Sequence, residues 1–495
     1  MALVFNNKKY IKSNAAGTLC RIAMVVCMLS LAGCISMSGI NPNAKSTLAA
    51  TLKVGKNIES ATRIDWPKLD WWKSYHDRQL DELIDKAISD SPTLHMAQAR
   101  VGLAQAYADS MHAEILPNIG ADASTARERF TELQFIPPPW GGHWDWNNKM
   151  TASIAYDLDL WGKQESLWNA SVDEMNASKL ELQQVKLELV TVMTRTYIQL
   201  ALEYRLRDLA DEYLKEIQHR VSIKQRSLKA GLGTKIEVIE AETALPMARA
   251  KIAAVDARIK LLKNQLAALS GQGPGAGDDI TRPAITLEAG IGLPDNLQAN
   301  LVGRRPDILA HRLHVEAALE NIDAAKKEFY PNINLLGFIG FQALGFGQLI
   351  SNAAAIAGAG PAISLPIFDG GRRRGNLSAK TASYDIAVEN YNAVLVKALQ
   401  DVSDQLVILQ SNSTQIKEVD MAVASAQKAH HLAEISYNGG LNNYEHVLDT
   451  YSMVLHQQEV RTRLQAVRLD AYAGLMRALG GGIIDETSAK AMPLP

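Results

Sequence analysis

Two long stretches of this chain contain neither glycine nor proline: residues 163–230 and residues 376–438. Their 68 and 63 residues are compatible with continuous helix. A helix of about 65 residues is roughly 100 Å long, so no compact globule holds it. Glycines end each stretch, and a return helix is predicted over about 235–270 and 443–479. The chain therefore predicts two helical hairpins of unusual length, packed like coiled coils.

The two hairpins belong to an internal duplication. Four landmarks recur in the same order, at spacings of 214, 214, 209 and 209 residues: Pro92 and Pro306, Pro117 and Pro331, Gly162 and Gly371, Gly231 and Gly440. The matches keep their order along the chain, and their spacing changes only once, by five residues. This pattern indicates a tandem repeat. We place the first repeat at 79–270 and the second at 296–480.

Each repeat starts with a helical segment, about 79–115 and 296–328, and continues with two β-like runs. The expected β-hairpins span about 117–162 and 331–369. Apolar residues alternate with polar ones in the first repeat, at Met150, Ala152, Ile154, Tyr156, Leu158 and Leu160. In the second repeat the shared face is Ile333, Leu335, Gly337, Ile339 and Phe341, followed by a small, apolar run over 357–367. The fold class is therefore α+β, with four strands per chain.

Four such strands cannot stand alone in a membrane, because open sheet edges leave unpaired backbone groups in lipid. Eight strands from a dimer or twelve from a trimer could close into a barrel. An eight-stranded barrel is filled by its own side chains, whereas twelve strands leave an opening. We therefore expect the chain to oligomerise around one shared barrel, with long helices leaving one end.

The N-terminus has the features of an export signal. Basic residues precede an apolar stretch of about 11 residues, 22–32, which is too short to span a bilayer. It ends in Leu31-Ala32-Gly33-Cys34, which resembles the bacterial lipobox. The resemblance implies removal of residues 1–33 and attachment of lipid, such as palmitate, to Cys34, and Ile35-Ser36 implies transfer to the outer membrane. The alternative is an ordinary signal peptide followed by a chance cysteine.

Composition and motifs exclude several other classes. A net charge of −2, from 51 basic and 53 acidic residues, argues against a nucleic-acid binder, and three cysteines do not make a disulfide scaffold. His311 with His314, and His430 with His431, have no third ligand nearby in sequence, so we expect no metal. No catalytic constellation is present, so we expect neither an enzyme nor a cofactor beyond the lipid on Cys34.

Several motifs resemble the TolC superfamily of outer-membrane efflux lipoproteins, in its multidrug-efflux branch. They are 71–80 (WWKSYHDRQL), 156–163 (YDLDLWGK), 304–308 (RRPDI), 329–333 (FYPNI), 365–372 (LPIFDGGR) and 479–482 (LGGG). The resemblance implies a trimer with a twelve-stranded outer-membrane barrel and a periplasmic α-helical tunnel. It also implies an equatorial belt, built from residues 34–78, the linker 271–295 and the tail 481–495.

The resemblance assigns roles to the turns of the two hairpins, at the tunnel's periplasmic end. It places contacts with a periplasmic adaptor at two sets of residues: Gly231, Leu232, Gly233 and Thr234, and Gly440, Leu441, Asn442 and Asn443. A periplasmic gate is expected at His446, Asp449 and Tyr437. His446 and Asp449 share one helix face and would form stacked rings in a trimer, where a pH-dependent pairing is our hypothesis.

The predicted function is a passive, gated outer-membrane duct for small toxic molecules and drugs. An inner-membrane pump of the resistance-nodulation-division or major-facilitator class would drive it through the adaptor. Two alternatives remain: a conduit for type I protein secretion, and a periplasmic coiled-coil scaffold lipoprotein without a pore.

Overall fold

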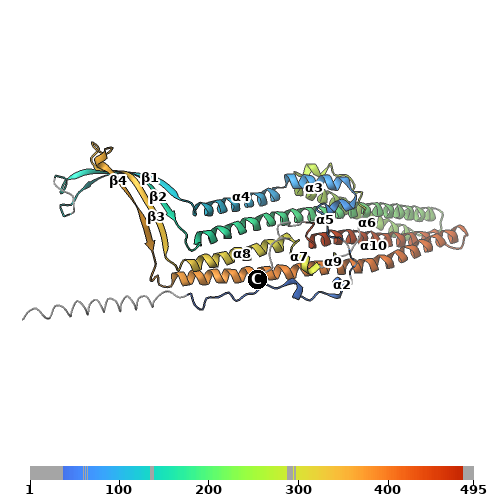
Figure 1. Ribbon diagram of the computed structural model, residues 1–495. Helices are drawn as coiled ribbons and strands as arrows, with labels where there is room; N and C mark the ends of the chain where they lie inside the picture. The colour runs from blue at the N-terminus through green and yellow to red at the C-terminus, as the bar shows by residue number, and fades with distance from the viewer. Residues whose placement is uncertain are drawn as a thin grey trace, which may run out of the picture. The chain divides into compact units, whose positions relative to one another are not determined.

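The computed structural model describes residues 37–133, 139–286 and 294–482, apart from residues 60, 62, 64, 295 and 296. The chain divides into two compact units (Figure 1). The first contains Met1–Lys45, Ala104–Met175 and Leu313–Glu389, and the second contains Ser46–Leu103, Asn176–Arg312 and Asn390–Pro495. The predicted signal segment 1–33, Cys34 and residues 483–495 of the predicted tail lie outside the described residues.

The first unit holds one four-stranded antiparallel sheet in the order β1-β2-β3-β4. The strands are β1 (Asn118–Arg129), β2 (Trp144–Asp157), β3 (Asn332–Leu344) and β4 (Ala355–Ser364). The duplicated hairpins join because β2 pairs with β3, with Ile154 opposite Gly337. Four strands per chain are thus confirmed, and β1 and β4 are the edges of this sheet.

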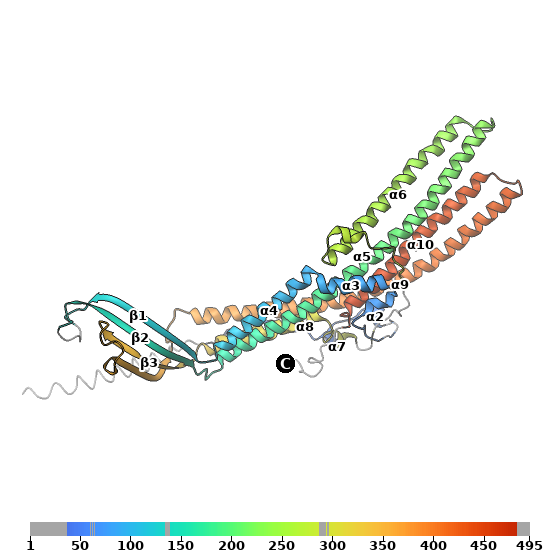
Figure 2. The ribbon, with the colours of Figure 1, turned by 90° about the horizontal axis from the view of Figure 1, so that it is seen from above.

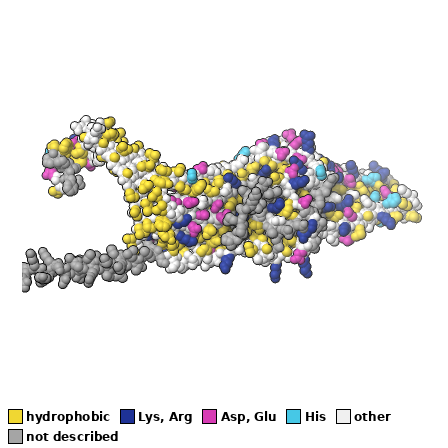
Figure 3. Space-filling view, in the orientation of Figure 1, with side chains coloured by type: hydrophobic (Ala, Val, Ile, Leu, Met, Phe, Trp, Pro, Cys, Tyr) yellow, Lys and Arg dark blue, Asp and Glu magenta, His cyan; other side chains and the backbone are white. Residues whose placement is uncertain are grey.

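One face of the sheet is apolar and uncovered (Figure 3). Ile119 pairs with Ile154, and Ile339 with Ala357; Ile119 and Ile339 are 76% and 68% exposed. Leu158 and Leu160 were expected on this face, but β2 ends at Asp157. The chain leaves the sheet there because Asp159 adopts a positive φ of 38°.

The helical segments expected over 79–115 and 296–328 are each divided into two helices. The structure has α3 (Arg78–Asp90) and α4 (Pro92–Ala113) in the first repeat, and α7 (Leu297–Leu301) and α8 (Pro306–Lys327) in the second. Both interruptions precede a proline. Proline disfavours the helical conformation of the residue before it but is well accommodated in the first turn of a new helix.

The corresponding helices of the two long hairpins have the same lengths. The outgoing helices α5 (Lys163–Lys229) and α9 (Arg372–Asn438) have 67 residues each, and the return helices α6 (Lys235–Leu269) and α10 (Tyr444–Ala478) have 35 each. Helix α9 starts four residues before the glycine-free run, since one glycine in a first turn does not prevent a helix.

In the second unit the two hairpins lie side by side with their turns at the same end (Figure 2). Ion pairs join them: Lys251 on α6 with Glu459 on α10 at 2.7 Å, and Arg195 on α5 with Asp470 on α10 at 2.6 Å. The hairpins therefore form one layer in which α10 contacts helices of both repeats.

Three glycines allow the chain after α10 to pack closely against distant parts of the second unit. Gly480, Gly481 and Gly482 all have positive φ, at 87°, 63° and 84°. A Cβ atom on Gly480 would overlap the carbonyl oxygen of Arg304, and one on Gly482 would overlap the backbone of Lys68. Only glycine fits this path, because it lacks the Cβ atom and tolerates positive φ.

The arginine-proline-aspartate motif strengthens the same junction. Arg305 is buried; it donates to the Asp307 carboxylate at 2.6 Å and to the carbonyl oxygen of Ala478 at 3.2 Å. Asp401 on α9 lies 3.5 Å from the same guanidinium. The start of α8 is thereby tied to the end of α10.

The remaining elements are short. They are η1 (Ala49–Thr51), α2 (Lys56–Glu59), η2 (Trp71–Tyr75), η3 (Pro274–Gly277) and η4 (Asn352–Ala354). None of the helices in the described ranges combines the length and apolar character needed to cross a membrane.

Candidate functional site

The two hairpin turns share one backbone design. Gly231 and Gly440 have φ of 75° and 71°, and the next residue donates its N–H back across the turn: Leu232 to Ser227 and Leu441 to Ser436, both at 2.9 Å. This is the glycine-dependent Schellman closure of a helix C-terminus. We define the first tip as residues 230–234 and the second tip as residues 439–443.

A side chain caps the return helix at each tip. Thr234 accepts from the backbone of Glu237, whose carboxylate accepts from Thr234 in turn. Asn443 accepts from the N–H of His446 at 3.1 Å. Both caps satisfy backbone donors at the start of a helix.

Each tip presents one apolar side chain to solvent. Leu232 and Leu441 are both 84% exposed and occupy equivalent places in the two repeats. An exposed leucine on a rigid turn is suited to packing against another protein. The adaptor contacts predicted at both tips are untested by this arrangement and stay a prediction.

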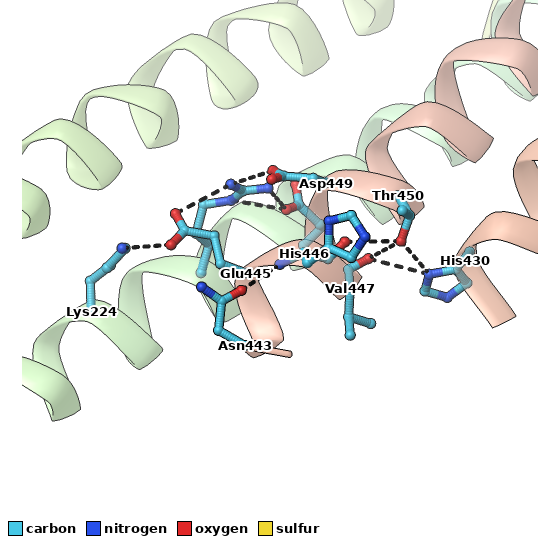
Figure 4. Close-up of polar contacts among 10 residues, drawn as sticks. Lys224, His430, Asn443, Glu445, His446, Val447, Asp449 and Thr450 are labelled. Carbon is cyan, nitrogen blue, oxygen red and sulfur yellow. Dashed lines mark hydrogen bonds and ion pairs between the residues drawn. The ribbon is translucent and has the colours of Figure 1, made fainter. Parts of the chain in front are cut away.

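The three predicted gate residues engage different partners, and Figure 4 shows two of them, His446 and Asp449, on α10 just after the second tip. Asp449 is bound by Arg220 of α5, whose Nη1 donates to it at 2.8 Å. His446 is exposed, and its backbone N–H is the one capped by Asn443. Tyr437, 42% exposed, packs edge-on against Tyr444 with ring centroids 4.9 Å apart. Their predicted gating role stays a prediction.

Sequence reasoning missed the basic half of this site, on α5. Arg220 also binds Glu216 at 2.9 Å, and Lys224 binds Glu445 of α10 at 2.8 Å. Together with Asp449 these residues join the first hairpin to the second. We call the five residues the inter-hairpin latch: Glu216, Arg220, Lys224, Glu445 and Asp449.

Burial sets the electrostatics of the latch. The Glu216 side chain is fully buried, and desolvation raises the pKa of its carboxyl group, opposed by the hydrogen bond from Arg220. The hydrogen bond to Glu445 raises the pKa of Lys224. Arg220 therefore stands between a buried carboxylate and the half-exposed Asp449, and holds α5 and α10 together through charge.

A cavity of about 440 Å³ adjoins the latch. His219 and His430 line it together with the aromatic rings of Tyr444 and Tyr451. The His430 Nδ1 lies 3.2 Å from the carbonyl oxygen of Val447. Over the described ranges, no group of three or more histidine, cysteine or acidic side chains has an arrangement that could hold a metal ion.

The sequence matches a known family over most of its length. The profile of the outer membrane efflux protein family aligns with residues 83–272 and 297–481, which are the two repeats.

Two curated relatives illustrate the similarity. The chain is 39% identical to the fusaric acid resistance protein FusA of Burkholderia cepacia, over 74% of this chain and 70% of that protein. It is 27% identical to the multidrug resistance outer membrane protein MdtQ of Escherichia coli O157:H7, over 93% of this chain and 98% of the relative.

Solved structures share the fold. The outer membrane protein VceC of Vibrio cholerae superposes with a TM-score of 0.78 at 33% identity, covering 84% of this chain and all of VceC. The outer membrane channel CmeC of Campylobacter jejuni gives a TM-score of 0.81 at 18% identity, over 90% and 96% of the two chains. The chain therefore belongs to the outer membrane efflux protein family and is an efflux protein of the outer membrane.

Proposed function

We propose that three copies of this chain close into one twelve-stranded barrel that continues as a periplasmic α-helical tunnel. The assembly would be the passive exit duct of a tripartite efflux system. The observation that supports this most is the sheet with two unpaired edges and an uncovered apolar face. In lipid, both edge strands need partners.

The strand directions fit such a closure. Neighbouring strands alternate in direction across the sheet, so β1 and β4 run oppositely. Strand β4 of one copy can therefore pair antiparallel with β1 of the next. Two copies would give eight strands and an interior filled by side chains, whereas three copies leave an open bore.

The duct would be gated and driven from its periplasmic end. The tips provide exposed Leu232 and Leu441 for an adaptor, and the latch with His446 and Tyr437 provides the gate. Transport energy would come from an inner-membrane pump of the resistance-nodulation-division or major-facilitator class. Opening then requires α10 to move away from α5, which breaks the contacts of Arg220.

The N-terminal segment supports a lipid anchor at Cys34. Met37 and Ile40 pack against the core cluster of Ile322, Ala325 and Leu377 in the first unit, the unit that contains the sheet. Cys34 is three residues before Met37. A lipid on this cysteine would therefore be attached near the unit that we place in the membrane.

Small toxic molecules are the proposed cargo. The relative named for fusaric acid resistance is 39% identical, which makes fusaric acid a suitable first compound for a resistance assay. A host that lacks the gene should become sensitive to such compounds, and the wild-type gene should restore resistance.

The decisive experiment combines mass and conductance. We expect light scattering of the purified protein to give three copies per particle, and planar bilayers to show small channels that open occasionally. A monomer or dimer without conductance would exclude the shared barrel. Photo-crosslinkers at positions 232 and 441, placed in the native host, should trap a periplasmic adaptor identified by mass spectrometry; trapping of none would remove the docking role.

A further inference from the structure

The two tips have the same backbone but opposite surroundings. Equivalent positions lie 209 residues apart. Arg226, Lys229 and Lys235 surround the first tip, and all three are exposed. Their counterparts around the second tip are Ile435, Asn438 and Tyr444, none of which carries a charge.

The two acidic residues that follow the second tip, Glu445 and Asp449, are already engaged. Glu445 and Asp449 face Lys224 and Arg220 within the latch. Tyr444 packs against Tyr437 and, at 5.0 Å between ring centroids, against His219 of α5. The second tip is therefore tied to the first hairpin by charge and by ring contacts.

The first tip is not engaged in this way. Among the described residues, Lys229 and Lys235 take part in no ion pair. Beside them, Leu228, Leu232 and Ile236 are 37%, 84% and 67% exposed. The first tip thus combines an apolar patch with free positive charge, the composition of a surface that attracts a negatively charged partner.

The positive charge of Lys235 also interacts unfavourably with the dipole of its own helix. Lys235 is the first residue of α6, where the helix dipole disfavours a positive charge. Tyr444, its counterpart on α10, avoids that conflict.

We propose that the two tips differ in function: the first tip, and not the second, is the electrostatic docking surface for an acidic segment of the adaptor. The inference rests on the proposed efflux function and adds the chemistry of the partner. Leu232 would supply the apolar contact at the first tip, and Arg226, Lys229 and Lys235 would meet carboxylates.

The test uses a matched pair of variants in the full-length protein. Lys229→Glu and Asn438→Glu each place one carboxylate on the last residue of a 67-residue helix. Both therefore bear the same unfavourable interaction with the helix dipole. The probe is the adaptor trapped by the crosslinker at position 232, purified and bound to the immobilised channel.

We expect Lys229→Glu to weaken binding about tenfold, mainly through slower association, and to flatten its dependence on salt. Lys229→Gln should give an intermediate loss, and Asn438→Glu less than about a twofold change. Each variant must keep the wild-type mass and conductance. Equal losses from Lys229→Glu and Asn438→Glu, or no loss from either, would overturn the division between the tips.

The same experiments distinguish failure of this inference from failure of the proposed function. If crosslinkers at neither tip trap an adaptor, the docking function itself fails. If adaptor binding is insensitive to Lys229→Glu while vesicles of phosphatidylglycerol bind the wild type and not the variant, the basic patch serves an anionic lipid surface and the inference is wrong.

Discussion

Arg220 and Asp449 are 229 residues apart in sequence, yet the guanidinium of one donates to the carboxylate of the other at 2.8 Å. The bond joins the outgoing helix of the first repeat to the return helix of the second, within a single chain. In the proposed gate, removing this bond should ease the movement of α10 away from α5.

Asp449→Ala should therefore increase the open probability of the channel. The Asp449 side chain is 57% exposed, so the pair contributes about 1 kcal/mol at most, or up to about a fivefold change in the open-to-closed ratio. Single-channel recording checks this. Asp420→Ala is the control, because it breaks an exposed pair with Arg461 inside the second hairpin. Identical traces for wild type and Asp449→Ala would remove the latch from gating.

Arg220→Ala should damage the protein more than Asp449→Ala. It leaves the carboxylate of Glu216 buried without its cation, which costs about 3–5 kcal/mol of folding free energy. A denaturant titration of both variants measures the difference. Adding Glu216→Gln to Arg220→Ala should recover part of the loss, since the amide carries no charge; no recovery would contradict the role of the buried carboxylate.

The first unit should lose stability as pH rises through the weakly acidic range. Burial, followed by repulsion from Glu316, Glu320 and Glu174, raises the pKa of Asp173 to about 6. The folded chain therefore holds this proton between about pH 4 and pH 6, where the unfolded chain has released it. The contribution of Asp173 to stability is therefore greatest below about pH 4, falls up to about pH 6 and is then level.

Asp173→Asn should flatten that part of the pH profile and raise stability at neutral pH by about 1–2 kcal/mol. Melting temperatures between pH 4 and pH 7.5 measure the effect. Asp323→Asn is the control, because Asp323 pairs with Lys326 at 3.0 Å and is not among the groups that shift the pKa of Asp173. Parallel pH profiles for wild type and Asp173→Asn would refute the assignment.

Gly480→Ala should be poorly tolerated. The position combines a φ of 87° with a Cβ that would overlap the backbone of Arg304, which cannot rotate away. We expect a loss of more than about 2 kcal/mol, measured as a lower denaturation midpoint. Gly370→Ala separates the two causes, since Gly370 has a φ of 66° and open space around it; it should cost only about 1 kcal/mol. Equal losses would show that steric overlap is unimportant at Gly480.

The sequence predicted the ends of the long helices well, but it predicted the shorter helices before the strands less well. Both results have one physical reason. Glycine and proline act locally, so the end of α5 at Lys229 follows from Gly231 and Gly233. Proline, however, both ends and begins helices. The division of the helical segments over 79–115 and 296–328 was not predicted; it occurs where Pro92 and Pro306 each start a new helix.

The latch could not be found from local patterns, because its partners are far apart in sequence. The internal duplication nevertheless contains information about where these partners lie. Arg220 lies eleven residues before Gly231, and Asp449 lies nine residues after Gly440. Two hairpins side by side with their turns level bring these positions to nearly the same height, since each residue of helix rises 1.5 Å. Tertiary packing determines which faces of α5 and α10 meet, so this part of the latch could be found only from the structure.

The three glycines at positions 480–482 also set a requirement on the folding of the second unit. They lie against Arg304, Leu187 and Lys68, which are 176, 294 and 414 residues away along the chain. Contacts of such large sequence separation form late, because closing long loops costs entropy before the contacts repay it. The apolar surfaces around this junction therefore stay exposed until late in folding, when they can associate with other chains.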